Sequence, residues 1–309
     1  MCATAHQKPE KAGAVEANQI QPLLFANGLS NLPMRAIIGG WSSWTFDIGG
    51  EYILRIARTD EIAQCHRKEA RLLPVLADAV EFEVPAPIRT GTHRGYEYML
   101  YRKLAGRAFD AGDDLATLGR TLQQLHGFDP STAASLTGGD ASPAAWQQRY
   151  QQIWEWVDVD VMPHLDAALQ QQVASRYRRM MKSVEDMVPT FVHADLGTEH
   201  ILVNDRNGEV RAIIDFETAT VGDPAIDFVG ILASLGRDAT TEVMAAYGSH
   251  IPWDRLHFYW WMGSVHAVKY GVEQNDRGII ADGIAGLRKR MRAIAHWDAA
   301  AIPRADSGR

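Results

Sequence analysis

The sequence predicts an α+β protein of two lobes, with a small β-rich N-terminal lobe and a larger, mainly helical C-terminal lobe. Three observations predict this fold class. Residues 35–58 alternate short β-type runs with two Gly-Gly pairs, a pattern typical of antiparallel strands joined by turns. From residue 104 onward most segments have helical periodicity, but residues 190–216 return to short strand patterns.

The chain can be divided where these patterns change. We predict a polar lead-in at residues 1–18, the N-terminal lobe at 19–103 and the C-terminal lobe at 104–309. The crossing between the lobes is expected near Tyr101–Gly106.

The bulk composition is that of a soluble globular protein. Hydrophobic residues make up 46% of the 309 positions, and no apolar run approaches the ~18 residues of a membrane span. The polar N-terminus lacks the apolar core of a secretion signal.

With only Cys2 and Cys65, a disulfide framework is excluded and a reducing cytoplasm fits best. The net charge of −7 argues against nucleic acid as a partner and favours a cationic ligand. We expect a monomer.

In the N-terminal lobe, a helix should follow the first three strands. Residues 60–77 have helical spacing, and Thr59 or Asp60 can cap that helix. Two further strands are predicted at residues 84–91 and 95–104.

The C-terminal lobe should begin with a helix and carry one central hairpin. Residues 113–128 start with capping aspartates and continue at helical period. Within residues 190–216, Asn207-Gly208 separates two strand-like runs, and both residue types tolerate the positive φ of tight hairpin turns.

This hairpin region carries the residues suited to chemistry. Asp195 follows a short apolar strand, where a carboxylate could accept the proton of a substrate hydroxyl and orient it for attack on a phosphate. The hairpin can return Asp215 to the same loop as a principal Mg²⁺ ligand, with His200 as a second contact. An isolated Asp usually caps a turn and an isolated His is usually structural. Their combination in this order favours the catalytic interpretation.

The segments His193–Val203 and Ala212–Phe228 resemble the signature of the aminoglycoside phosphotransferase family. The family pattern is His-x-Asp, four residues, Asn or His, and then Ile-Asp-Trp or Ile-Asp-Phe. Many members have Asn at the position of His200, whereas the aminoglycoside 2″- and macrolide 2′-phosphotransferases have His there, so this chain resembles that branch most. The resemblance extends over about residues 35–290. It implies a bilobal, protein-kinase-like fold, Mg²⁺ as cofactor and ATP or GTP as phosphate donor.

The resemblance also implies a nucleotide site in the N-terminal lobe. The turn Gly39-Gly40 lies where the family covers the phosphates, so Ser42 and Ser43 are expected to contact phosphate oxygens. Arg55 occupies the position of a phosphate-binding Lys or Arg, with Arg58 as the alternative.

Two further regions complete the predicted nucleotide site. Glu69, on the following helix, matches the acid that pairs with the phosphate-binding cation. Tyr101 and Lys103 belong to the hinge that would hold the purine. Because backbone groups recognise the purine there, the sequence does not decide between ATP and GTP, and the similarity to this branch makes GTP a serious alternative.

A second block of the signature suggests supporting roles. Asp223 precedes Pro224 and can cap the amides of a helix start. Asp227 lies one turn further along and is expected to brace the catalytic loop through His193.

The acceptor site is expected in the C-terminal lobe. Glu217, Glu273 and Asp276 offer carboxylates for a polyamine, and Trp260 offers an apolar wall. We therefore predict an antibiotic O-phosphotransferase that confers resistance by modifying a cationic antibiotic, with an aminoglycoside favoured. The alternatives are a macrolide 2′-phosphotransferase, a tuberactinomycin phosphotransferase, and a metabolic kinase acting on choline or a sugar.

Overall fold

The computed structural model describes residues 17–38, 42–140 and 142–301. Its N-terminal part is a five-stranded antiparallel sheet in the order β1-β2-β3-β5-β4. The strands are β1 (Met34–Ile37), β2 (Ser43–Ile48), β3 (Tyr52–Ala57), β4 (Pro87–His93) and β5 (Tyr96–Arg102). The predicted strands of this lobe are therefore all present.

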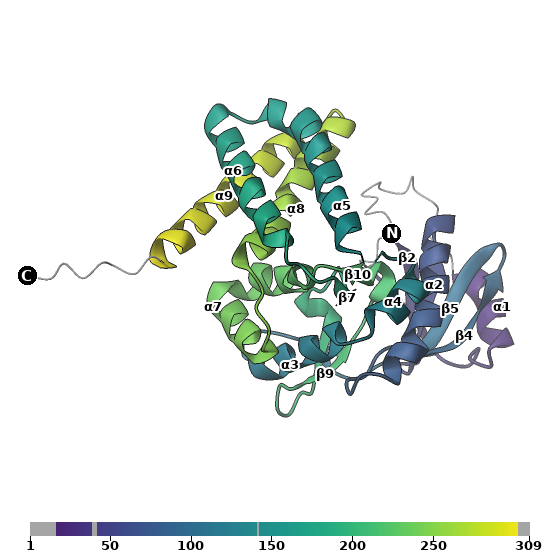
Figure 1. Ribbon diagram of the computed structural model, residues 1–309. Helices are drawn as coiled ribbons and strands as arrows, with labels where there is room; N and C mark the ends of the chain where they lie inside the picture. The colour runs from purple at the N-terminus through teal and green to yellow at the C-terminus, as the bar shows by residue number, and fades with distance from the viewer. Residues whose placement is uncertain (1–16, 39–41, 141, 302–309) are drawn as a thin grey trace, which may run out of the picture.

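Two helices flank this sheet (Figure 1). Helix α1 (Ala17–Ala26) contributes Ile20, Leu23 and Leu24 to a cluster with the apolar side chains of β2 and β3. It begins inside the predicted lead-in, whose other residues lie outside the described ranges. Helix α2 (Asp60–Ala77) has the predicted bounds, and the Thr59 hydroxyl accepts a hydrogen bond from the Ile62 amide as its cap.

The rest of the described chain is mainly helical, as predicted (Figure 1). Its α-helices are α3 (Leu115–His126), α4 (Pro130–Thr137), α5 (Pro143–Trp156), α6 (Ala167–Val184), α7 (Val229–Tyr247), α8 (Trp253–Glu273) and α9 (Arg277–Ala301). Asp114 caps α3, in agreement with the aspartates that mark this helix in the sequence. The bounds of α8 and α9 leave a break that includes Asp276.

Five short strands form two small sheets between these helices. They are β6 (Arg107–Ala108), β7 (Thr190–Val192), β8 (Ile201–Val203), β9 (Val210–Ile213) and β10 (Thr220–Gly222). Strands β8 and β9 form the predicted hairpin, and Gly208 in its turn has φ of +69°. Strand β7 pairs with β10, which the sequence analysis did not predict.

Two apolar cores support the C-terminal region. One joins α3 and α7 to the short strands, and its buried side chains include Leu118, Phe191 and Phe216. The other lies within α5, α6, α8 and α9 and includes Tyr150 and Trp261. Across the described ranges, none of the helices combines the length and apolar character that a membrane span requires.

Candidate active site

The hairpin brings the predicted catalytic and metal-binding residues together. His200 directly precedes β8, and its carbonyl accepts a hydrogen bond from the Ile214 amide at 2.9 Å. Asp215 is the next residue, and its left-handed backbone (φ +68°) turns the chain out of the hairpin. His200 Nε2 lies 3.8 Å from Asp215 Oδ2. Residues fifteen positions apart in this motif therefore meet because β8 pairs with β9, which places Ile201 opposite Ile213.

His200 also reaches the loop that carries Asp195. Its Nδ1 donates to the Asp195 carbonyl at 2.8 Å, since a carbonyl can only accept. In the neutral imidazole this leaves the lone pair on Nε2, which faces Asp215. Asp195 itself is exposed, in the loop three residues after β7. The structure thus places the predicted base and both predicted metal ligands at one locus.

A buried carboxylate holds the backbone of the catalytic loop. Asp227 accepts hydrogen bonds from the amides of His193 and Ala194, both at 2.8 Å. Ala194 has φ of +67°, an uncommon conformation for a residue with a Cβ. Asp227 therefore has the predicted bracing contact with His193. His126 Nε2 donates to the same carboxylate at 3.0 Å, a partner that the sequence analysis missed.

Two further contacts fix this loop. The His193 Nε2 donates to the Ile214 carbonyl at 2.9 Å, and the Thr218 hydroxyl donates to the His193 carbonyl at 2.9 Å. Asp223 accepts from the Ala225 amide, as its predicted capping role requires, and it also accepts from the hydroxyls of Tyr150 and Tyr259.

Arg55 joins the N-terminal sheet to the hairpin region. Its Nη1 lies 3.1 Å from Glu69 Oε2 and 3.4 Å from Asp215 Oδ1. Its Nη2 lies 2.5 Å from Glu217 Oε2. The side chains of Arg55 and Glu69 are only 7% and 2% exposed, so these charges compensate one another away from water. The predicted Arg55–Glu69 pair is present, and it extends to the proposed metal ligand.

Glu217 contacts two residues of the N-terminal lobe, Arg55 and Ser42. Its carboxylate also accepts from the Ser42 hydroxyl at 2.7 Å. The backbone carbonyls of Glu217 and Ala219 accept from Lys68 Nζ at 2.5 and 2.9 Å. Two donors predicted to meet phosphates, Arg55 and Ser42, thus meet one carboxylate that was predicted to meet the acceptor.

Burial and neighbouring charge shift the titration of these groups. Burial raises the pKa of Glu69 to about 7, although Arg55 opposes the shift. Burial alone would lower the pKa of Arg55, but Glu69, Asp215 and Glu217 raise it above its ordinary value. Burial also raises the pKa of Glu217, and partial desolvation of the Asp195 carboxyl group raises its pKa although the residue as a whole is exposed. Partial burial would raise the pKa of Asp215, yet Arg55 and His200 lower it.

The other predicted nucleotide residues have different surroundings. Ser43 is buried, and its hydroxyl lies 2.9 Å from His66 Nε2. Tyr101 lies beside Arg55 in β5, and burial raises its pKa. Lys103 Nζ donates to Asp47 Oδ2 at 2.7 Å. The turn at Gly39-Gly40 lies outside the described residues.

The predicted acceptor residues on α8 and at its end have local partners. Glu273 pairs with Lys269 one turn earlier at 2.5 Å. Asp276 accepts from the amides of Gly278 and Ile279 at the start of α9. Trp260 is half-buried and stacks on Trp297 with ring centroids 5.2 Å apart. The partners named for these three side chains all lie on α8 or α9, and none of them belongs to the Asp195 locus.

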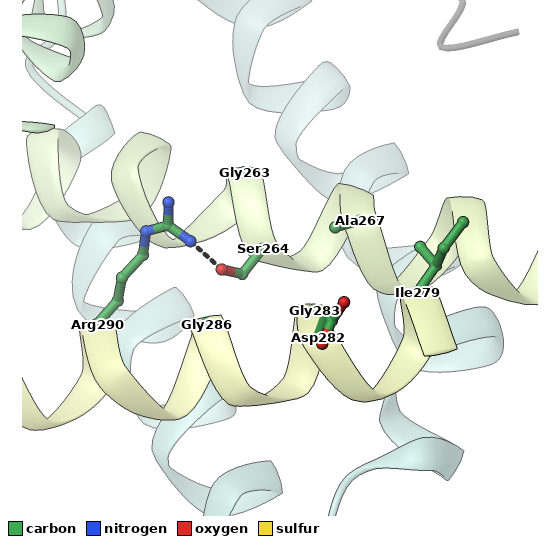
Figure 2. A pocket seen from close by; sticks show the side chains of 8 residues that line it. All are labelled: Gly263, Ser264, Ala267, Ile279, Asp282, Gly283, Gly286 and Arg290. Carbon is green, nitrogen blue, oxygen red and sulfur yellow. Dashed lines mark hydrogen bonds between the residues drawn. The ribbon is translucent and has the colours of Figure 1, made fainter. Parts of the chain in front are cut away.

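Helices α8 and α9 also enclose a groove of about 330 Å³ (Figure 2). The helices can approach this closely because residue 283 is glycine. A Cβ at that position would lie 2.8 Å from the Val268 amide nitrogen. The Arg290 guanidinium crosses the groove and donates to the Ser264 hydroxyl. None of the residues predicted to bind the acceptor is among those that line the groove.

The residues at the Asp195 locus fit Mg²⁺. Within the described part of the chain, no group of three or more His, Cys, Asp and Glu residues could hold a metal. Mg²⁺ does not need such a cage, because it commonly combines one or two carboxylates with water and substrate phosphates. The Asp215 side chain is 40% exposed, so its carboxylate can reach such an ion.

Comparisons with known proteins identify the family and relatives of this chain. Residues 33–259 match the model of the phosphotransferase enzyme family. The viomycin phosphotransferase of Streptomyces vinaceus is 24% identical over 256 residues, covering 78% of this chain and 88% of that protein. An uncharacterised Bacillus subtilis protein, YcbJ, is 31% identical over 140 residues, covering 44% of this chain and 42% of its own length.

Solved structures share the fold. The GDP complex of an aminoglycoside 2′-phosphotransferase IIIa superposes with a TM-score of 0.80 at 23% identity, covering 91% of this chain and 99% of that one. A macrolide 2′-phosphotransferase from Brachybacterium faecium gives a TM-score of 0.68 at 22% identity, covering 87% and 97%. The predicted kinase-like fold is confirmed.

Proposed function

This chain belongs to the phosphotransferase enzyme family, and we propose that it transfers the γ-phosphate of ATP or GTP to a hydroxyl group of an antibiotic. The observation that carries this proposal is the meeting of Asp195, His200 and Asp215 beside the buried Arg55–Glu69 pair. Similar proteins named for phosphorylating viomycin, aminoglycosides and macrolides support an antibiotic acceptor.

Asp195 is the proposed catalytic base. Its exposed carboxylate would accept the proton of the acceptor hydroxyl while that oxygen bonds to the γ-phosphorus and the bond to the β-phosphate oxygen breaks. The raised pKa of Asp195 makes its carboxylate a stronger proton acceptor than an ordinary aspartate. The amide contacts of Asp227 keep the loop that carries Asp195 in one conformation before substrate arrives.

The donor would occupy the space between the sheet and the hairpin. Asp215 and His200 would hold Mg²⁺, which neutralises phosphate charge when bound. Arg55 would face the phosphates, with Glu69 holding its guanidinium in place. Ser42, Tyr101 and Lys103 remain candidates for loop and hinge contacts. Since Ser43 is packed against His66, its hydroxyl would need to reorient to reach a phosphate.

We propose a cationic acceptor, on the basis of the net charge of −7 and the carboxylates of Glu217, Glu273 and Asp276. Each of these groups already has an internal partner, so an ammonium group would share or replace it. The scarcity of cysteine and the nucleotide donor support a cytoplasmic location.

The decisive experiment measures product formation with ATP and with GTP against aminoglycosides, macrolides and tuberactinomycins. We expect Mg²⁺-dependent phosphorylation of at least one cationic antibiotic, abolished in Asp195→Asn. Turnover of choline or a sugar with all antibiotics inert would instead support a metabolic kinase. Efficient turnover of macrolides alone would replace the cationic acceptor with a lipophilic one.

A further inference from the structure

We propose that Lys68 is a positioning residue for phosphoryl transfer, and that it locks the segment after Asp215 onto α2. The inference rests on the proposed roles of Arg55 and Asp215, but it concerns a side chain that belongs to neither the base nor the metal site. Lys68 would set the distance between the phosphate-binding arginine and the metal-binding aspartate without touching substrate.

The contacts of Lys68 reach across the sequence. Its ammonium donates to the carbonyls of Glu217 and Ala219, which lie 149 and 151 positions away. These carbonyls flank the end of the short 3-10 turn Phe216–Thr218 that directly follows Asp215. One ammonium group therefore fastens the middle of this turn and the residue that follows it to α2.

The site demands a cation with several donors. Lys68 is only 8% exposed, so removing its charge from water is costly unless polar partners replace the water. Hydrogen bonds from an ammonium group are stronger than those between neutral groups. Burial lowers the pKa of Lys68 to about 8, and the nearby carboxylates of Glu69 and Glu217 oppose this shift by favouring the charged form. An apolar side chain at this position would leave two carbonyls without their donor.

Helix α2 holds both halves of the proposed phosphate site through consecutive residues. Lys68 fixes the turn after Asp215, and Glu69 fixes Arg55, whose Nη1 lies 3.4 Å from Asp215 Oδ1. The same turn reaches the catalytic loop, because the Thr218 hydroxyl donates to the His193 carbonyl. A shift of the turn would therefore displace Asp215 relative to Arg55 and the loop of Asp195.

The test compares Lys68→Met and Lys68→Arg with the wild-type protein. For Lys68→Met we expect nucleotide Kd in the presence of Mg²⁺ to rise roughly 10- to 100-fold, as for residues that orient a metal ligand. The Kd measured in EDTA should change less than about twofold. The KM for the acceptor should also change less than about twofold. Lys68→Arg should bind nucleotide in the presence of Mg²⁺ with a Kd much closer to that of the wild type.

Arg67→Met is the matched control. Arg67 lies on the same helix, is 53% exposed and pairs with Glu97, so its loss removes an ion pair of α2 without touching the turn. We expect Arg67→Met to bind nucleotide with the wild-type Kd, both with Mg²⁺ and with EDTA. A general structural effect of Lys68 would instead alter nucleotide binding equally with Mg²⁺ and with EDTA, and this result would overturn the proposal.

Separate outcomes distinguish this inference from the proposed function. A wild-type protein that binds no nucleotide would contradict the function itself. Wild-type binding that Lys68→Met retains with an unchanged Mg²⁺ response would contradict the role of Lys68 alone. Thermal unfolding identifies a variant that does not fold. If Lys68→Met does not fold, Lys68→Gln replaces it. A higher nucleotide Kd with Mg²⁺ in Lys68→Gln than in Lys68→Arg supports the proposal, and equal values contradict it.

Discussion

The hairpin region and the α8–α9 region both carry acidic residues, but they use them differently. Around the hairpin, Glu69 of α2 and the carboxylates of Asp215 and Glu217 in the segment after β9 converge on one buried arginine of β3. At the end of α8, Glu273 pairs with a lysine of its own helix, and Asp276 caps the next helix. Convergence from distant elements indicates a binding site, whereas acids with neighbours close in sequence often serve their own helix.

The largest effect is expected at the base. Asp195→Ala should lower kcat by about 10²–10⁴-fold, the usual contribution of a positioned general base. Nucleotide Kd should change little, because Asp195 faces the acceptor in the proposed mechanism. Steady-state kinetics and calorimetry measure the two quantities. The control is Glu199→Gln, which removes an exposed carboxylate of the same loop. Near-normal turnover of Asp195→Ala would exclude Asp195 from the mechanism.

The two proposed metal ligands should differ in importance. Asp215→Ala should weaken Mg²⁺-nucleotide binding by roughly 100-fold, and His200→Ala by several-fold, because Mg²⁺ prefers carboxylate oxygen to imidazole nitrogen. Calorimetry at several Mg²⁺ concentrations measures both. Asp205→Ala removes a carboxylate at the exposed tip of the same hairpin and should have no effect. A larger loss for His200→Ala would reverse the assignment.

Acid should destabilise the α8–α9 region through His257. This imidazole is 2% exposed and stacks near Trp253 and Trp297, and neither ring nitrogen has a hydrogen-bond partner among the described residues. Burial lowers its pKa from 6.5 to about 4. Because the unfolded chain binds the proton first, stability is fully present above pH 6.5 and falls as the pH drops toward 4.

At pH 5 the lowered pKa of His257 corresponds to a loss of about 2 kcal/mol of unfolding free energy relative to neutral pH. Urea unfolding at pH 7.5 and pH 5 measures it, and His257→Phe should lose less stability between the two conditions than the wild type. An equal loss in both proteins would assign the acid sensitivity to other groups.

The smallest effects are expected at the acids of the α8–α9 region. Glu273→Gln and Asp276→Asn should each raise the KM of a cationic acceptor a few-fold with kcat almost unchanged, since such contacts hold ground state and transition state alike. The wild-type KM should rise with salt, because exposed charges are screened over ~8–10 Å. A salt-insensitive KM, with Trp260→Ala more harmful than either acid variant, would support a macrolide-like acceptor.

Local signals made much of the fold predictable. Thr59 and Asp60 marked the start of α2, and Gly208 marked the turn of the hairpin that joins His200 to Asp215. The pairing of β7 with β10 was missed, because three-residue strands leave little periodicity in a sequence. Helix α1 was missed because its surroundings read as a polar lead-in.

Long-range contacts limited the prediction of the site. His126 and Lys68 each lie on amphipathic helices, where a polar residue gives no sign of a partner more than a hundred positions away. The hydroxyl of Ser43 could not be assigned a direction from sequence, since strand register decides which face it occupies. Glu217 was predicted to contact the acceptor, and its contact with Arg55 was missed because it depends on how the two lobes meet.

The support of the catalytic loop has a consequence for how the enzyme becomes active during folding. The left-handed Ala194 depends on Asp227, which in turn is bonded to His126, 101 positions earlier in the chain. Contacts between such distant positions form slowly, because the intervening chain must first be ordered. We therefore expect refolding protein to recover its helical circular dichroism before its turnover. The interval between the two recoveries should lengthen when Asp227→Asn weakens the acceptor of these amides.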